Sequence, residues 1–385
     1  MDGGSREPTH HRSGERATLK RKLDAGVNIH MPAPRRIGKT WTIGRLAGDL
    51  RSAGWLAVEV DVQGMSTPHQ FAADLCARIE EQIDAKKRVM AHLVKRLDGL
   101  LGGGWGDKPL EALGRVDPVQ FAETLVDALS QSEKNTVIII DEISYFFLAL
   151  AETDAKAAHQ FAYQLRALQL RYKKVRWLIT GSIGLDTIAR RYNLQGAFVD
   201  FETFPLESFT PEQARSYLRD PAVQEQLTHP FTASDEDFEA MFADLGWLAP
   251  FYLKLVANEV RPSLQGANGP GQATKADFDA AFDRLLQPHR RAEFAVWPEH
   301  VRKNLPAADR AVAEHVLAAL SRHPEGETED TLIAHTVSAE PGAGQRQIRE
   351  VLSILVTDGL LMRSGQRFKF RSGLVRRYWL DYEAA

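Results

Sequence analysis

Mostly apolar runs alternate with segments of helical spacing through the first half of the chain. The runs cover residues 27–31, 55–62, 136–140 and 175–180. The helices between and after them are expected over residues 17–25, 39–54, 68–83, 117–129 and 159–172. Runs that are apolar throughout are typical of parallel strands buried on both faces of a sheet. The pattern therefore predicts an α/β fold with an open parallel sheet, helices on both faces, and ligands beyond the carboxyl ends of the strands.

Beyond residue 204 the spacing of apolar residues becomes helical. Helices are expected over residues 210–218, 235–242, 250–260, 277–286, 311–321, 330–335 and 345–357. Alternation over residues 359–370 predicts a β-hairpin, and helices followed by a hairpin are typical of a winged helix. We therefore expect a flexible tail (1–16), an α/β domain (17–207), a helical domain (208–300) and a winged-helix domain (301–385). Residues 86–117 fit neither pattern and are interpreted as an insertion.

Composition narrows the class of protein. The chain has 385 residues, of which 44% are hydrophobic and 26% are charged, so two or three domains are expected. The formal net charge of −3 means that any nucleic-acid contact must come from a local patch. The single cysteine, Cys76, excludes an intramolecular disulfide and a cysteine-based zinc cluster. No apolar run approaches the roughly 20 residues of a membrane span, and residues 1–15 lack the apolar region of a signal peptide. We expect a cytoplasmic protein without a membrane contact.

The first apolar run leads into a loop that precedes an amphipathic helix. The loop reads Ala33-Pro34-Arg35-Arg36-Ile37-Gly38-Lys39-Thr40. A loop between a strand and a helix presents backbone N–H groups and the positive end of the helix dipole to phosphate oxygens. Lys39 would reach the β- and γ-phosphates, and the Thr40 hydroxyl would be a ligand of Mg²⁺. The string follows the P-loop pattern G-x-x-x-x-G-K-[ST], except that Ala33 replaces the first glycine, which a negative φ allows. The alternative is a Lys-Thr pair that starts an ordinary helix.

Two carboxylates close the third apolar run, and two hydroxyl groups close the fourth. Asp141 and Glu142 should meet the P-loop, because parallel strands end at one edge of a sheet. Asp141 would anchor Mg²⁺ through water, and Glu142 would polarise the attacking water. Thr180 and Ser182 are candidates for contact with the γ-phosphate or the water. The alternatives are a solvated turn for the carboxylates and a helix cap for the hydroxyl groups.

Basic residues gather near the C-terminus. Residues 361–377 hold six basic residues and no acidic residue. The candidate DNA contacts on the expected recognition helix and hairpin are Arg346, Gln347, Arg349, Arg363, Arg367 and Lys369. Such a patch can neutralise phosphates, and the alternative is a winged helix that docks on protein. Arg190 and Arg191 are candidates for a phosphate contact, with a solvated helix face as the alternative. Phe368, Phe370, Tyr378 and Trp379 are expected in the core.

These strings together resemble a known family. Residues 31–40, 137–142, 177–182 and 204–218 are similar to those of AAA+-type ATPases of the STAND group. The similarity is to the archaeal-ATPase-like branch and, more distantly, to origin-recognition ATPases, and residues 359–379 resemble that group's winged helix. It implies ATP or ADP with Mg²⁺, and a small helical lid over residues 208–300. It also implies that nucleotide state switches the conformation.

The resemblance assigns roles residue by residue. Lys39 and Thr40 match the Walker A positions, Asp141 and Glu142 match Walker B, and Ser182 matches sensor 1. Residues 246–250 resemble the lid motif whose proline lies near the adenine. The nucleotide-binding residues are then Ala33, Pro34, Arg35, Arg36, Ile37, Gly38, Lys39, Thr40, Trp41 and Pro250. The chain departs from the family at Ala33 and at the sensor-2 arginine, for which Lys254 is the nearest basic residue.

Three interpretations of function are compatible with these patterns. The first is an ATPase that couples its nucleotide state to movement of the lid and the winged helix. The second is a DNA-binding regulator, or a DNA-transaction factor, in which ATP is a switch ligand. The third is an interaction scaffold that does not hydrolyse ATP. The expected partners are ATP and, depending on the interpretation, duplex DNA, other proteins or further copies of this chain. Turnover separates the first from the others, and salt-sensitive DNA binding separates the second from the third.

Overall fold

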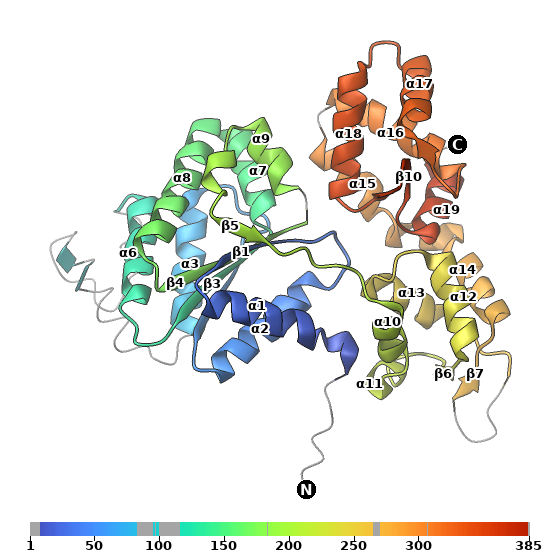
Figure 1. Cartoon of the computed structure of the whole chain (residues 1–385), viewed down its shortest axis with the longest axis horizontal. Helices are drawn as coiled ribbons and strands as arrows, with labels where there is room; N and C mark the ends of the chain where they lie inside the picture. The colour runs from blue at the N-terminus through green and yellow to red at the C-terminus, as the bar shows by residue number, and fades with distance from the viewer. Residues whose placement is uncertain are drawn as a thin grey trace, which may run out of the picture. The chain divides into compact units, whose positions relative to one another are not determined.

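The computed structural model of the chain describes residues 8–82, 95–96, 98–99, 116–182, 184–264, 270–305 and 307–383. The chain forms two compact units (Figure 1). The sheet unit comprises Gly14–Ala33 and Lys39–Leu206, and the helical unit comprises Met1–Ser13, Pro34–Gly38 and Glu207–Ala385. Most of the insertion expected over residues 86–117 lies outside the described residues.

The sheet unit is built on a parallel sheet in which β4 lies between β3 and β1. Its strands are β1 (Asn28–Pro32), β2 (Leu56–Asp61), β3 (Thr136–Asp141), β4 (Val175–Gly181) and β5 (Phe201–Thr203). They are arranged in the order β2-β3-β4-β1-β5, and every pairing is parallel. The predicted open parallel sheet is therefore confirmed. The predicted strands match β1 to β4, whereas β5 was not predicted, because three residues are too few to show a period.

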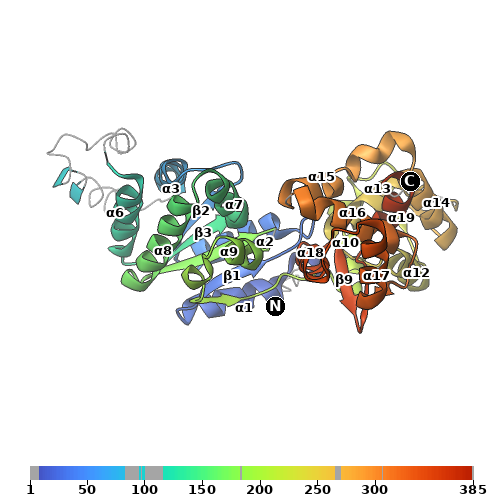
Figure 2. The same cartoon turned by 90° about the horizontal axis from the view of Figure 1, so that it is seen from above.

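Helices cover both faces of this sheet (Figures 1 and 2). They are α1 (Ser13–Asp24), α2 (Lys39–Ser52), α3 (Pro68–Gln82), α6 (Pro118–Ser130), α7 (Ile143–Thr153), α8 (Ala155–Arg171) and α9 (Leu185–Arg191). Every residue of β3 is buried. Ile138 and Ile140 join the core beneath α3, α6, α7 and α8, and Val137 and Ile139 are buried outside that core. Alternate residues of one strand therefore serve two cores, which explains the continuous apolar run.

Two predictions for the sheet unit need correction. The helix expected over residues 159–172 begins at Ala155, and a separate helix, α7, precedes it immediately after Glu142. Residues 9–16, which were assigned to a flexible tail, form the short helix η1 (Thr9–His11) and the first turns of α1. The reason is burial, because Arg12 is 1% exposed and its guanidinium lies over the ring of Phe209.

The helical unit begins with a group of helices that carry strong cap signals. They are α10 (Pro211–Leu218), α11 (Pro221–Gln224), α12 (Asp235–Leu245), α13 (Pro250–Glu259) and α14 (Lys275–Leu285), with the short strands β6 (Phe231–Thr232) and β7 (Gly271–Gln272). The hydroxyl of Thr210 and the side chain of Gln213 form a capping box at α10, and Pro250 opens α13. Caps of this kind satisfy the first N–H groups of a helix. The starts of α10 and α13 were predicted correctly, whereas α11, β6 and β7 were not predicted.

The C-terminal part of the helical unit contains the predicted helices and hairpin. It comprises η3 (Pro288–Glu293), α15 (Val296–Asn304), α16 (Ala307–Ser321), α17 (Glu329–Ala339), α18 (Gln345–Thr357) and α19 (Gly373–Tyr382), with strands β8 (Glu327–Thr328), β9 (Leu361–Ser364) and β10 (Arg367–Phe370). β10 pairs antiparallel with β9 and with β8. The four aromatic residues expected in the core are buried. α15 and α19 were not predicted.

Within the residues that the structure describes, no single helix is both long and apolar enough to cross a membrane. Among the same described residues, α12 and α13 pass that test as a pair, and the pair is bent by 117°.

Candidate functional site

Side chains from three places in the sheet unit meet at the carboxyl edge of the sheet. Lys39 and Thr40 form the first turn of α2, Asp141 ends β3, and Ser182 follows the end of β4. Because β4 pairs with both β1 and β3, the chain segments that come after these strands are neighbours. The convergence predicted from strand order is therefore present.

Lys39 is held by both carboxylates. Its Nζ lies 2.5 Å from Oε1 of Glu142 and 3.2 Å from Oδ1 of Asp141. The lysine side chain is 6% exposed. A buried ammonium needs opposite charges and hydrogen-bond acceptors close by, and these two residues supply both.

Both oxygens of Asp141 are engaged by hydroxyl groups. The Thr40 hydroxyl donates to Oδ2 at 2.8 Å, and the Thr180 hydroxyl donates to Oδ1. Asp141 itself is 5% exposed. The two threonines fix the plane of the carboxylate, so Oδ2 faces the first turn of α2. Thr180 thus positions Asp141, a role that the sequence did not indicate.

Glu142 occupies a strained position between β3 and α7. Its φ of 60° lies in the left-handed region, which costs a residue with a side chain about 1 kcal/mol or more. Its Oε2 accepts hydrogen bonds from the backbone N–H of Ser182 at 3.0 Å and from the Ser182 hydroxyl at 2.9 Å. The turn and these bonds aim the carboxylate at Lys39. Strain of this kind is characteristic of functional positions, where surrounding contacts enforce it.

A third carboxylate lies next to this pair. Asp61 ends β2 and is the register partner of Asp141. Burial raises the pKa of Asp61 above its ordinary value, and the nearby charges of Asp141 and Glu142 raise it further. Asp61 was not predicted as a site residue, although its position at the end of an apolar run was a usable signal. The carboxylates at this edge of the sheet thus outnumber the lysine. This excess of negative charge favours the binding of a divalent cation.

The backbone of the loop between β1 and α2 shows whether alanine can replace the first glycine. Ala33 has no positive φ, so the missing glycine causes no strain at that position. Arg36 and Gly38 have φ values of 71° and 86°. Within the helical unit, the Arg36 guanidinium lies 4.2 Å from the ring centre of Phe251. A Cβ on Gly38 would lie 3.6 Å from Cγ of Pro250, so the proline and the loop are adjacent there.

Other predicted site residues lie at the surface. Trp41 is exposed, with the Arg45 guanidinium over its ring. Arg190 and Arg191 are exposed in the last turn of α9, which fits the solvated-face alternative. Lys254 is exposed on α13 and lies 3.4 Å from Oε1 of Gln226. None of these observations assigns a role in the site.

The candidate DNA contacts fall into two sets. On α18, Arg346 pairs with Glu350, Arg349 pairs with Glu329, and Gln347 donates to Asp309. On the hairpin, Arg363 and Arg367 donate to the backbone carbonyls of Gly365 and Gly326. Among the described residues, neither hairpin arginine forms an ion pair.

Comparisons with known proteins identify the fold. No protein-family model matches the chain, and no curated protein matches its sequence. The Walker-type ATPase paby2304 of Pyrococcus abyssi is similar in structure, with a TM-score of 0.62 and 14% identity over 95% of each chain. The ORC2 protein of Aeropyrum pernix, in its ADPNP-ADP complexes, matches with a TM-score of 0.55 and 12% identity. That match covers 94% of this chain and 89% of the other. The chain therefore has the α/β fold of these neighbours, followed by a C-terminal helical region.

Proposed function

We propose that the chain binds ATP with Mg²⁺ and hydrolyses it slowly. The observation that carries the proposal is the network of Lys39, Thr40, Asp141 and Glu142 at the carboxyl edge of the sheet. A positive helix end, a lysine, a hydroxyl and two carboxylates are the groups that phosphoryl transfer to water requires. The loop residues 33–40 would supply further backbone N–H groups to the phosphates.

The donor set suits magnesium. Thr40 Oγ1 and Asp141 Oδ2 are hard oxygen donors, only 2.8 Å apart, and Mg²⁺ prefers oxygen ligands with several waters retained. Thr40 would be a direct ligand, and Asp141 would hold the ion through water. The ion would neutralise charge on the phosphates.

Glu142 and Ser182 have distinct roles in this proposal. Glu142 is the base that polarises the attacking water, and Lys39 holds the γ-phosphate. Ser182 positions the glutamate through the two hydrogen bonds to Oε2. Without those bonds the carboxylate would be free to turn away from the reacting water, which would slow the reaction.

The structural neighbours support this proposal in outline. One neighbour is described as a Walker-type ATPase, and the structure of the other contains ADPNP and ADP. We further propose that residues 208–300 act as the lid and residues 301–385 as a winged helix, and that Pro250 contacts the adenine. In this STAND-like switch, nucleotide state changes the arrangement of these parts.

Nucleotide binding and turnover by the purified full chain test the proposal. We expect calorimetry to detect one ATP per chain with Mg²⁺, much weaker binding in EDTA, and measurable phosphate release. Asp141→Asn should lose most of the magnesium dependence, whereas Asp24→Asn, which alters only an exposed pair with Lys20, should behave as wild type. Failure to bind ATP at millimolar concentration would overturn the proposal. Binding without turnover would favour the scaffold or the switch ligand.

A second function, DNA binding, is favoured by one observation. The hairpin arginines Arg363 and Arg367 are exposed and donate to backbone carbonyls, and among the described residues neither forms an ion pair, so their charges remain available to phosphates. Arg346 and Arg349 on α18 already face carboxylates. We therefore propose that the hairpin, with Lys369, supplies most of the affinity for duplex DNA, and that α18 contributes less.

A further inference from the structure

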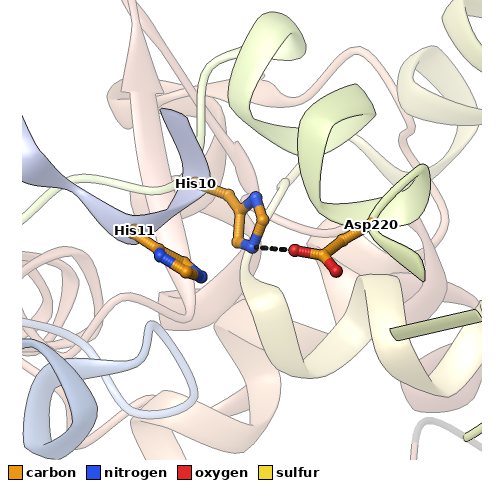
Figure 3. Close-up of side chains that lie close together, drawn as sticks. All are labelled: His10, His11 and Asp220. Atoms are coloured by element: carbon orange, nitrogen blue, oxygen red, sulfur yellow. Dashed lines mark ion pairs between the residues drawn. The ribbon is translucent and has the colours of Figure 1, made fainter. Parts of the chain in front are cut away.

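We propose that the N-terminal segment and the start of α11 form a binding site for a divalent transition-metal ion, with Zn²⁺ the best match. The ligands are His10, His11 and Asp220, whose ligand atoms all lie within 4.8 Å of one another. All three residues belong to the helical unit. Figure 3 shows the two imidazole rings and the carboxylate gathered in one place. This site is separate from the proposed nucleotide site, and no motif in the sequence indicated it.

His10 is oriented in the manner of a metal ligand. Its Nδ1 lies 3.1 Å from the Ser216 hydroxyl, and its Nε2 lies 3.2 Å from Oδ2 of Asp220. His10 is 5% exposed, and its ring packs edge-on against Tyr217. Metal-bound histidines almost always engage the other ring nitrogen in a hydrogen bond, which fixes the tautomer and the ring orientation. Ser216 supplies that partner, so Nε2 faces the carboxylate.

Asp220 is oriented by the backbone. Its Oδ1 accepts a hydrogen bond at 2.8 Å from the N–H of Ala222, because Asp220 is the N-cap of α11. The cap bond turns Oδ2 towards His10. In a tetrahedral zinc site, neighbouring ligand atoms lie about 3.3 Å apart. The 3.2 Å between Oδ2 and Nε2 of His10 matches this spacing.

His11 makes the arrangement more than an ion pair. Its ring centre is 4.4 Å from that of His10, and the rings are inclined by 76°. An ion pair needs only one histidine and one carboxylate, whereas here a third ligand atom lies within reach. Two imidazoles and one carboxylate favour zinc-like ions over Mg²⁺ or Ca²⁺. Three protein ligands also leave one tetrahedral position for water or an added ligand.

Metal binding would have a local structural consequence. Arg12 follows His11 directly and donates a hydrogen bond of 3.1 Å to the carbonyl of Ile37. Coordination would tie η1 to α10 and α11, and would hold Arg12 in place against that loop residue. The ion would then stabilise a segment of the chain that has only a short helix of its own.

Metal titration of the untagged full chain, freed of metal with EDTA and without nucleotide, tests the proposal. We expect calorimetry to detect one Zn²⁺ per chain, Co²⁺ to give the absorption bands of a tetrahedral site, and bound metal to raise the melting temperature. His11→Asn and Asp220→Asn should each weaken binding by about 100-fold or more, and Ser216→Ala by about tenfold. Asp220→Asn retains the oxygen that caps α11, so it preserves the fold even where a histidine variant does not.

The matched control is His323→Asn. His323 is exposed and lies 3.1 Å from Glu327, so it forms a histidine–carboxylate pair that is not part of a three-ligand cluster among the described residues. This variant should bind metal as tightly as wild type. The proposal is wrong where the wild type takes up neither Zn²⁺ nor Co²⁺, or where the folded Asp220→Asn variant binds them as tightly as wild type, which would indicate an adventitious ion only.

Discussion

The ammonium of Lys39 lies 2.5 Å from Oε1 of Glu142, so the cation at the start of α2 pairs with the residue directly after β3. The same ammonium lies 3.2 Å from Asp141. Each charge compensates another that would otherwise be buried singly. Lys39, Asp141 and Glu142, which the sequence assigns to the phosphate, the magnesium ion and the water, therefore form one network of charges. A substitution of one of them changes the electrostatic environment of the other two.

Lys39→Ala should abolish measurable ATP binding. The variant removes the ammonium that pairs with Asp141 and Glu142, an effect on the order of several kcal/mol in a partly desolvated place. It also leaves Asp141 and Glu142 facing each other, so the melting temperature should fall as well. The matched control is Lys20→Ala, which removes an exposed pair with Asp24 and should leave both properties unchanged.

The double variant Lys39→Ala/Glu142→Gln separates these two effects. It removes one of the uncompensated carboxylates, so part of the lost stability should return, whereas ATP binding should not. Calorimetry with equal ATP affinity in wild type and Lys39→Ala would refute the P-loop assignment.

Glu142→Gln should keep the affinity for ATP and slow turnover by about 100-fold or more. The amide preserves the shape of the side chain but cannot act as a base. Single-turnover phosphate release measures the effect. The control is Glu59→Gln, which alters a partly exposed ion pair between Glu59 on β2 and Arg51 on α2. An unchanged rate in Glu142→Gln would assign the base to another residue.

Glycine and alanine at position 142 should differ in stability. Both remove the carboxylate, but only glycine relieves the left-handed φ of 60°, which costs other residues about 1–2 kcal/mol. The greater entropy of glycine in the unfolded chain offsets about 0.5–1 kcal/mol of this gain. Glu142→Gly should therefore melt above Glu142→Ala. At Gln160, exposed within α8, the order should reverse. If the alanine variant melts above the glycine variant at both positions, no strain is stored at Glu142.

The sequence predicted most of the sheet because each strand carries a local signal. The continuous run at residues 137–140 requires burial on two faces, and the P-loop pattern predicts both the loop after β1 and the start of α2. Where the local signal is weak, the prediction fails. In α7 most side chains are buried, so its apolar run showed no helical period.

The details of the site depend on contacts between distant residues. The hydrogen bonds from Ser182 to Glu142 join positions 40 residues apart, and the backbone strain of Glu142 has no sequence signature. The helical turn at residues 9–12 likewise depends on Ser216 and Phe209, far along the chain. Pairing of Arg349 with Glu329 spans 20 residues. Composition and spacing alone cannot reveal such pairs.

Replacing Arg363, Arg367 and Lys369 by alanine should weaken binding to all duplex sequences alike. Each lost phosphate contact should reduce the slope of log affinity against log salt by about 0.9. Fluorescence anisotropy at several salt concentrations measures both quantities.

The comparison variant for this experiment carries Arg346→Ala and Arg349→Ala. It should lose less affinity, because Glu350 and Glu329 already neutralise those charges. Any loss caused by Arg346→Ala or Gln347→Ala should depend on particular base pairs, since a helix in the major groove reads base edges. No binding of wild type to duplex DNA at low salt, with ATP or ADP present, would identify the C-terminal region as a protein-docking module.

His30 should make the protein less stable as the pH falls below neutrality. It lies in β1, is 8% exposed, and its Nε2 has no hydrogen-bond partner among the described residues. Burial lowers the pKa of His30 from 6.5 to about 4. Between these values the unfolded chain takes up a proton that the folded chain does not, so folding loses about 3 kcal/mol by pH 4. Well above pH 6.5 the histidine is neutral in both states and this loss disappears.

The variant His30→Asn isolates this contribution, because asparagine does not titrate. Its difference in unfolding free energy from wild type should be constant above pH 7 and should shift in favour of the variant as the pH falls from 6.5 to 4. Urea unfolding at matched pH values gives this difference directly, and carboxylates that titrate in the same range cancel between the two proteins. Parallel curves for wild type and variant would mean that His30 accepts a proton as readily in the folded chain as in the unfolded one. The strand that leads into the P-loop would then have to admit a charge, which is incompatible with its burial on both faces of the sheet.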